Sequence, residues 1–205
     1  MLRPLPFAQP QRLVEVKASG EQHFESSDVS YPDFFDWRTQ AHSFEHLLAY
    51  HDTSDTLTGV NRPLHLGCEV VSWEMVPTLG ISPELGRGFS PEDEKQGSRV
   101  ILISHTFWKT QFAGDRSVLG RSISLGGNLY TIIGVMPATF RFPVTQPNNS
   151  FWTTLAVDAD VTDIRPLTAN RSTHFLTVVG RLKPGVTVAQ ADQEMKVIAA
   201  RLAKQ

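Results

Sequence analysis

The sequence predicts an α+β protein made of two connected parts. Short β-branched runs recur along most of the chain, with glycine, proline and asparagine between them. Two stretches, starting near residues 31 and 187, combine a helix-capping signal with apolar residues at the helical period. Glycine and proline also gather between residues 77 and 91, which indicates a boundary between the two parts.

The first part is expected to open with a strand and a helix. A β-prone run covers residues 13–16. Ser30 can cap a helix that starts at about Tyr31, with a proline and an acid in its first turn. The apolar residues that follow keep a 3.6-residue period as far as Phe44. This spacing places residues 42–46 at the end of the helix.

A hairpin and then a strand-to-helix unit follow. The runs at 47–58 and 64–72 are partly β-branched and are separated by turn residues, which predicts the hairpin. Residues 100–103 form a continuous apolar run, typical of a buried strand. Ser104 can cap a short helix directly after it.

Another hairpin is predicted from alternating residues at 123–125 and a run at 130–135, joined by a glycine-rich turn. Residues 156–170 show no period and are left unassigned. The run at 175–179 is typical of a buried strand, which Gly180 is expected to close.

The last element is an amphipathic helix. Thr187 and Gln190 are spaced as a capping box, in which the hydroxyl accepts from the third amide and the Gln side chain bonds the cap amide. The apolar residues that share one face are Val188, Ala191, Met195, Ile198 and Leu202.

Composition excludes several classes of function. The 205 residues carry 19 Lys and Arg against 21 Asp and Glu, so there is no basic surplus for binding nucleic acid. Cys68 is the only cysteine, which excludes an internal disulfide and a cysteine-based metal site. No run approaches the roughly 20 apolar residues of a membrane helix, and two early prolines break any signal-peptide core. We therefore expect either a cytoplasmic protein or a domain excised from a longer chain.

One motif could carry chemistry. Residues 42–46 match the H-x-x-E-H pattern of inverted zinc peptidases, in which His42 and His46 would bind zinc and Glu45 would be the general base. A catalytic zinc needs a third protein ligand, and the sequence does not indicate one. We favour a polar helix end, with a zinc-dependent hydrolase using His42, Glu45 and His46 as the less favoured alternative.

The other polar clusters predict structure. His51, Asp52, Ser54 and Asp55 are side chains of the triad type, but the chain has no G-x-S-x-G elbow, so we interpret them as loop residues. Paired acids near residues 33 and 92 occupy the first turns of expected helices, where the helix dipole favours negative charge. The sequence thus predicts no catalytic, cofactor-binding or metal-binding residue, and no cofactor.

Several short sequence segments, taken in order, resemble those of one protein family. The first half contributes Leu2-Arg3-Pro4-Leu5-Pro6, Gln11-Arg12-Leu13-Val14, Ser30-Tyr31-Pro32-Asp33-Phe34, Val71-Ser72, Leu79-Gly80-Ile81 and Gly86-Arg87-Gly88-Phe89. The second half contributes Leu102-Ile103-Ser104, Phe112-Ala113-Gly114-Asp115, Leu119-Gly120-Arg121, Ile133-Gly134-Val135-Met136-Pro137 and Val179-Gly180-Arg181-Leu182-Lys183-Pro184-Gly185-Val186-Thr187. Together they resemble the MacB-like periplasmic core domain, which lies between the first two membrane helices of many ABC-transporter permeases. These segments are most similar in sequence to those of the duplicated permeases common in acidobacteria.

The resemblance implies a division of the chain. A porter-like α/β subdomain would comprise residues 10–85 and would be completed, after a linker, within residues 151–205. A β-rich, sabre-like subdomain would be inserted at residues 86–150. This division agrees with the boundary expected from the glycine and proline cluster.

The resemblance also implies a function. The chain would be the non-catalytic, extracytoplasmic (periplasmic) domain of a membrane protein, coupling transmembrane motion to the handling of a substrate or partner in export, efflux or lipoprotein-type transport. Its partners would be the membrane helices of the parent permease, with an ATPase subunit, a dimer mate or an adaptor protein as further candidates, and no nucleic acid. A free-standing secreted binding protein is the alternative.

Overall fold

The strands of this protein join one mixed sheet. The computed structural model describes residues 6–18, 28–59, 62–145, 148–159 and 167–203, and within them the strand order is β1-β9-β2-β3-β8-β5-β7-β4, with β6 paired to β2 and β7. The strands are β1 (Leu13–Val16), β2 (Phe44–Thr58), β3 (Leu64–Val71), β4 (Leu85–Gly86), β5 (Val100–Ile103), β6 (Ser122–Leu125), β7 (Asn128–Val135), β8 (Phe151–Thr154) and β9 (Thr177–Leu182). The α-helices are α1 (Tyr31–Gln40), α2 (Met75–Leu79), α3 (His105–Phe112), α4 (Ala156–Ala159) and α5 (Val188–Leu202). The 3-10 helices are η1 (Pro10–Arg12), η2 (Pro91–Glu94), η3 (Arg116–Val118) and η4 (Leu167–Ala169), and the predicted α+β class is confirmed.

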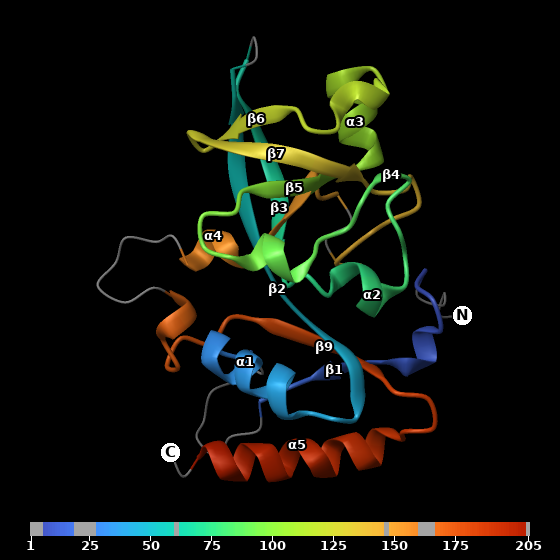
Figure 1. Cartoon of the computed structure of the whole chain (residues 1–205), viewed down its shortest axis with the longest axis vertical. Helices are drawn as coiled ribbons and strands as arrows, with labels where there is room; N and C mark the ends of the chain where they lie inside the picture. The colour runs from blue at the N-terminus through green and yellow to red at the C-terminus, as the bar shows by residue number, and fades with distance from the viewer. Residues whose placement is uncertain (1–5, 19–27, 60–61, 146–147, 160–166, 204–205) are drawn as a thin grey trace.

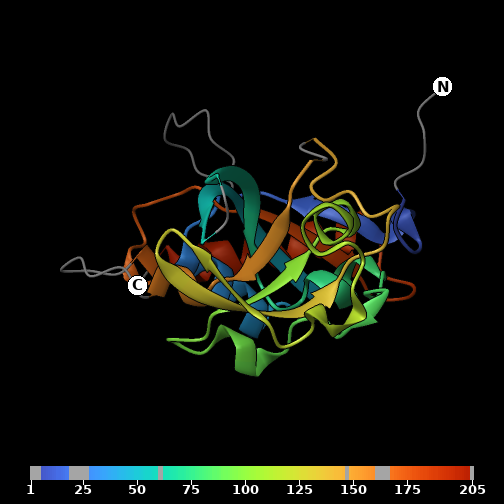
Figure 2. The same cartoon turned by 90° about the horizontal axis from the view of Figure 1, so that it is seen from above.

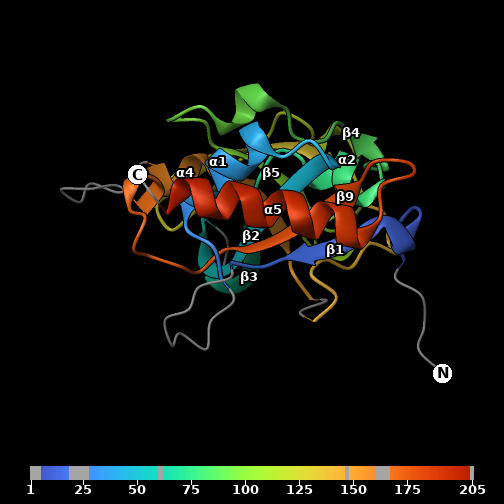
Figure 3. The ribbon, with the colours of Figure 1, turned by 90° about the horizontal axis from the view of Figure 1, so that it is seen from below.

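The long strand β2 connects two halves of the molecule (Figure 1). Its first residues pair with β9 in the lower half, and its last residues pair with β3 and β6 in the upper half. Seen from below, α5 crosses under β1 and β9 with α1 beside it (Figure 3). Seen from above, the β2–β3 pair, the β6–β7 hairpin and α3 lie on the side that faces the viewer (Figure 2).

Buried apolar side chains form three groups. One packs α1 and α5 against β1, β9 and the start of β2, with Phe34 and Ile198 among its members. Another lies in the upper half around β5, β7 and α3. The third joins the halves, because Leu48 and Met75 pack there with Leu102 and Trp152. Burial of these faces is the main force that holds the elements together.

Helix α1 begins where the sequence predicts but ends earlier. Ser30 caps it by accepting a hydrogen bond from the Asp33 N–H at 3.2 Å. The prediction that residues 42–46 lie at the end of this helix is wrong, because α1 ends at Gln40 and Phe44 already begins β2. The Phe44 ring occupies the space above Gly180 of β9, where a Cβ would not fit. Strand pairing and burial of this ring override the helical spacing, which is a local signal.

The closing strand lies slightly further along the chain than predicted. β9 starts at Thr177 and continues through Gly180 to Leu182, so the prediction that Gly180 closes the strand is wrong. β9 is paired on both sides, with β1 and with β2, and the glycine stays extended between them to admit the Phe44 ring. Both predicted hairpins, the strand at 100–103, the helix capped by Ser104 and the final helix are confirmed.

The last strand of the chain, β9, pairs with the first, β1. β1 and β9 pair antiparallel, from Leu13 opposite Arg181 to Val16 opposite Val178. The division into residues 10–85, 86–150 and 151–205 stays a prediction, since the sheet runs without a break through β3, β8 and β5. Part of the unassigned stretch forms α4 and η4, while residues 160–166 lie outside the described residues.

Candidate functional site

The segment at residues 7–12 is seated against helix α2. The Ala8 N–H donates to the Leu79 carbonyl at 3.1 Å, and Phe7 is buried in the group that contains Leu79. Gly80 ends α2 with φ of 67°, and a Cβ there would stand 2.5 Å from the Ala8 Cβ. Position 80 therefore favours glycine for its backbone angle and for the close approach of the segment.

Arg181 of β9 joins this segment to the sheet from beneath. Its side chain is buried, and Nε donates to the Thr78 carbonyl at 2.6 Å while Nη2 donates to the Ala8 carbonyl at 2.7 Å. Burial and the nearby charge of Arg12 lower the pKa of this guanidinium, and Glu45 opposes the change. One side chain thus holds three segments that are distant in sequence.

Arg12 attaches the same segment to the end of β9 and to the start of β2. Its Nε donates to the Leu182 carbonyl at 2.8 Å, and its Nη2 lies 2.7 Å from Glu45 Oε1. The hydrogen bond from Arg12 lowers the pKa of Glu45, which keeps this carboxylate charged. We call Arg12, Arg181 and Glu45 the N-terminal clamp.

Helix α5 is attached by a carboxylate and by apolar packing. Glu194 Oε1 accepts from the His42 N–H and Oε2 from the Ser43 N–H, both at 2.8 Å. Burial raises the pKa of Glu194, but these hydrogen bonds lower it more, so the net shift is downward. Ala191 and Ile198 of the same helix are buried in the lower group.

Both attachments meet at the start of β2. Glu194 binds the two amides that precede this strand, and Glu45 is its second residue. At about 3.3 Å per residue, a strand of 15 residues spans roughly 50 Å. Both attachments therefore converge on β2, the strand that continues from the lower half into the upper half.

A further charged cluster links α1 to η2. Arg38 Nη1 lies 2.8 Å from Glu94 Oε2 and 3.5 Å from Glu74 Oε1, and the Trp73 N–H donates to Glu94 Oε1 at 2.7 Å. Burial raises the pKa of Glu74 to about 7, with Glu94 adding to the shift and Arg38 opposing it. Burial thus favours the protonated form of Glu74 relative to an exposed glutamate.

A mainly apolar pocket of about 440 Å³ lies beside the N-terminal clamp. Its lining includes Phe7, Leu13 and Leu79 together with Phe142 and Val144. The segment at residues 7–12 thus shares a pocket with the chain that leads into β8.

The residues of the H-x-x-E-H motif make contacts that hold the fold together. Glu45 pairs with Arg12, the His46 ring packs on Trp73 with centroids 6.2 Å apart, and the backbone N–H of His42 binds Glu194. Residues 44–46 are in a strand, so the helical geometry that the motif requires is absent. Among the described residues, no group of three His, Cys, Asp or Glu side chains is placed to hold a metal ion.

His51, Asp52, Ser54 and Asp55 lie in strand β2, so their interpretation as loop residues is wrong. Polar residues occupy both faces of the strand between residues 51 and 56, so the sequence there lacks the apolar–polar alternation that indicates a strand. His51 Nε2 lies 2.8 Å from Asp158 Oδ2, and the Tyr31 hydroxyl donates to the same carboxylate. Burial lowers the pKa of His51, but the bond to Asp158 raises it more, giving a net rise. The pair ties β2 to α4.

Sequence reasoning missed the clamp and the role of Glu194. Arg12 contacts a carbonyl 170 residues away, and Arg181 contacts one 103 residues away. No local pattern reports such contacts. The one available signal was Arg181 itself, a charged residue inside an otherwise apolar strand, which must find partners when it is buried.

Comparison with known proteins gives the family. A sequence profile of the MacB-like periplasmic core domain matches residues 3–198. The chain belongs to this family. No curated protein matches it. The MacB-like domain is therefore of the kind found in ABC-transporter permeases, on the periplasmic side of a membrane protein, and the expected family is confirmed.

Solved structures support the fold at low sequence identity. The domain is similar to the periplasmic region of MacB from Actinobacillus actinomycetemcomitans, at 12% identity and a TM-score of 0.67, over 94% of this chain and 84% of that one. It is similar to a domain of a putative permease protein from Porphyromonas gingivalis, at 17% identity and a TM-score of 0.69, over 95% and 86%. The extracellular domain of the noncanonic ABC-type transporter YknZ from Gram-positive bacteria matches at 16% identity and a TM-score of 0.63, over 93% and 91%.

The family and these neighbours are periplasmic or extracellular parts of transporters rather than known enzymes. Within the described ranges, none of the helices combines the length and the apolar character needed to cross a bilayer.

Proposed function

We propose that this MacB-like domain transmits movement between the membrane helices of a parent permease and a substrate or partner on the extracytoplasmic side, without a catalytic centre of its own. In this proposal the two chain ends continue into membrane helices, and an ATPase subunit drives them. Residues 10–85 and 151–205 form the porter-like base, and residues 86–150 form the inserted sabre-like part. A dimer mate or an adaptor protein contacts the upper half.

The attachment of both chain ends to the start of β2 carries this proposal. Arg12 and Arg181 fix the segment at residues 7–12, and Glu194 fixes α5 to the amides of His42 and Ser43. These charge-assisted hydrogen bonds are partly buried or exposed, and they are short and directional, so each transmits a displacement for as long as it stays formed. Tension on either end is thus passed to the sheet.

The experiment uses the full-length permease with its ATPase in a membrane. One spin label is placed by Leu129→Cys, at a residue that is 66% exposed near the β6–β7 turn, and a second on the cytoplasmic side of a flanking membrane helix. Burial raises the pKa of the Cys68 thiol, so this native cysteine resists labelling. Nucleotide binding is expected to change the distance between the two labels.

Arg181→Ala and Glu194→Ala are expected to abolish or broaden that distance change while ATP hydrolysis continues. Lys196→Ala is the matched control on α5, because its exposed pair with Asp192 lies within the helix. An unchanged distance response in both Arg181→Ala and Glu194→Ala would contradict the proposal. So would a wild-type protein whose labels do not respond to nucleotide at all.

A further inference from the structure

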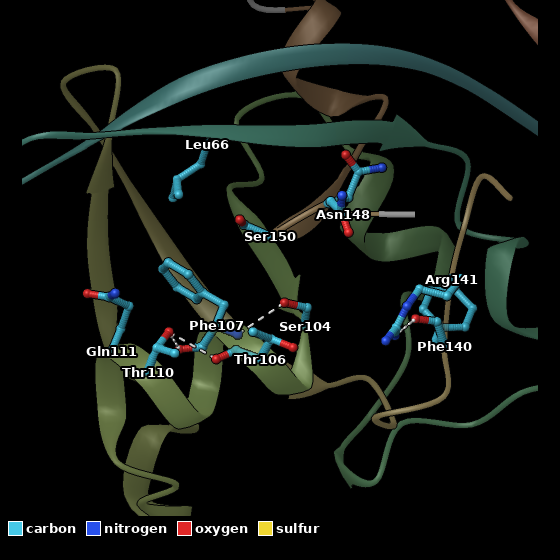
Figure 4. A pocket seen from close by; sticks show the side chains of 11 residues that line it. Leu66, Ser104, Thr106, Phe107, Thr110, Gln111, Phe140, Arg141, Asn148 and Ser150 are labelled. Atoms are coloured by element: carbon cyan, nitrogen blue, oxygen red, sulfur yellow. Dashed lines mark hydrogen bonds between the residues drawn. The ribbon is translucent and has the colours of Figure 1, made fainter. Parts of the chain in front are cut away.

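A polar pocket of about 270 Å³ lies in the upper half, away from the clamp (Figure 4). Ser104, Thr106, Phe107 and Thr110 line one side of it, from the start of α3. The other side is formed by the Phe140–Arg141 turn and by the residues that lead into β8. The remaining lining residues are Leu66, Gln111, Asn148, Asn149 and Ser150.

The walls of this pocket are fixed by the protein's own hydrogen bonds. The Ser104 N–H donates to the Ser150 carbonyl at 2.9 Å, and the Ser150 N–H donates to the Gly67 carbonyl at 2.9 Å. The buried Asn149 amide donates to Glu69 Oε1 at 3.0 Å and to the Phe142 carbonyl at 3.2 Å. A site held in this way loses little conformational freedom when a ligand binds.

The guanidinium of Arg141 is also held in place. Its Nη1 donates to the Ala138 carbonyl at 2.8 Å and to the Phe140 carbonyl at 2.6 Å. Both of these hydrogen bonds use the same nitrogen, so Nη2 and Nε are left to donate elsewhere. The residue is exposed at the rim, which makes those donors accessible to a ligand.

The lining of the pocket carries positive but no negative charge. All eleven lining residues are described, and none of them is an aspartate or a glutamate, whereas Arg141 supplies a positive charge. Four hydroxyl side chains and the amides of Gln111 and Asn148 add donors and acceptors that suit ligand hydroxyls, while the Asn149 amide nitrogen already donates to Glu69 and Phe142. Phe107 and Phe140 present apolar surface, against which the C–H face of a sugar ring can pack.

We propose that this pocket binds a sugar acid of about one ring, with its carboxylate on Arg141 and its hydroxyls on the amide and hydroxyl side chains. The volume suits a monosaccharide and is small for a drug-sized ligand. The inference does not depend on the transmission of movement, because none of the pocket's residues belongs to the clamp. With a single guanidinium at an open rim, a dissociation constant on the order of 1 mM is expected.

Backbone amide NMR titrations of this chain test the proposal with three probes: glucuronate, glucose and acetate. Glucuronate is expected to shift the amides of residues 104–111, 140–141 and 148–150, and to bind at least about tenfold more tightly than glucose or acetate. No shift at these residues, up to concentrations about twentyfold above the expected dissociation constant, would refute the site. Acetate that binds as tightly as glucuronate would refute the role of the sugar ring.

Two variants test the assigned roles. Arg141→Ala should reduce glucuronate binding at least about tenfold and leave glucose binding unchanged. Asn148→Asp replaces an amide of the lining by a negative charge on an exposed residue, so it should weaken glucuronate more than glucose. Arg116→Ala is the control, an exposed arginine of η3 outside the pocket, and should change neither. Glucuronate binding that survives both pocket variants would overturn the proposal, and unchanged amide spectra of the free variants establish that they fold.

Discussion

The segment at residues 7–12 and helix α5 attach to the same region of the sheet, the first mainly through arginine hydrogen bonds and the second mainly through apolar packing. Arg12 and Arg181 donate to three backbone carbonyls, and Phe7 adds a buried ring. α5 buries Ala191 and Ile198 and adds the two hydrogen bonds of Glu194.

This contrast predicts how each end should respond to tension. A hydrogen bond has a narrow geometry and a small net stability, so a segment held by a few of them can open locally while the sheet stays folded. A helix held by buried side chains opens only when the core beneath it is exposed. We therefore expect the N-terminal segment to be the releasable connection and α5 the permanent one.

The largest effect is expected for the apolar attachment. Ile198 is only 3% exposed, so Ile198→Ala should lower the free energy of unfolding by about 2–5 kcal/mol through lost burial and a cavity. Met195 packs at the margin of the same group and should give a smaller loss on truncation. Val197→Ala is the control, since Val197 is 60% exposed and should change stability by less than about 0.5 kcal/mol. Urea unfolding followed by circular dichroism measures all three, and a near-neutral Ile198→Ala would mean that this face of α5 is not core.

Arg181→Ala should give the next largest loss. The change leaves the carbonyls of Thr78 and Ala8 without this donor, and about 1–3 kcal/mol is expected for buried groups left unpaired. The loss should be local as well as global, so hydrogen exchange of the Ala8 amide should accelerate more than that of β9. Arg181→Lys keeps the charge but not the two-directional donors, and is expected to recover only part of the protection. Equal acceleration in β9 and at Ala8 would contradict a releasable segment.

Glu194→Gln tests the polar part of the α5 attachment. One of its two acceptor oxygens is lost, and about 0.5–1.5 kcal/mol is expected. The folded state lowers the pKa of Glu194, so its contribution is present above the pKa of the unfolded chain and disappears as the pH falls through the lower, folded value. Stability measured from neutral pH down to acid should therefore show a smaller decrease in the variant than in the wild type. Parallel pH profiles would mean that Glu194 makes no such contribution.

Local signals in the sequence were sufficient for most elements but not for the attachments. Ser30, Ser104 and Thr187 gave the helix starts correctly, because a cap depends on residues within one turn. Strand β8 was missed, since its place between β3 and β5 is set by partners far along the chain. The clamp was missed for the same reason, and the end of α1 was misplaced because Phe44 fits the helical period while its ring belongs on β9.

Two variants should separate charge from hydrogen bonding within the N-terminal clamp, and Glu45→Gln is expected to have the smallest effect of all. Arg12 makes an ion pair with the partly exposed Glu45 and a hydrogen bond with the Leu182 carbonyl. Salt at about 1 M screens an exposed pair almost completely, whereas a bond to a backbone carbonyl in a folded sheet is little affected. Glu45→Gln should therefore destabilise slightly at low salt and not at all at high salt. Arg12→Ala should lower the unfolding free energy by about 0.5–1.5 kcal/mol at both salt concentrations, because the Leu182 carbonyl loses its donor in either case. The effect of Arg12→Ala could instead disappear at high salt together with that of Glu45→Gln. The clamp would then be held by the Arg12–Glu45 ion pair rather than by the bond to the Leu182 carbonyl. In that case the attachment of residues 7–12 would be even weaker, relative to that of α5, than argued above.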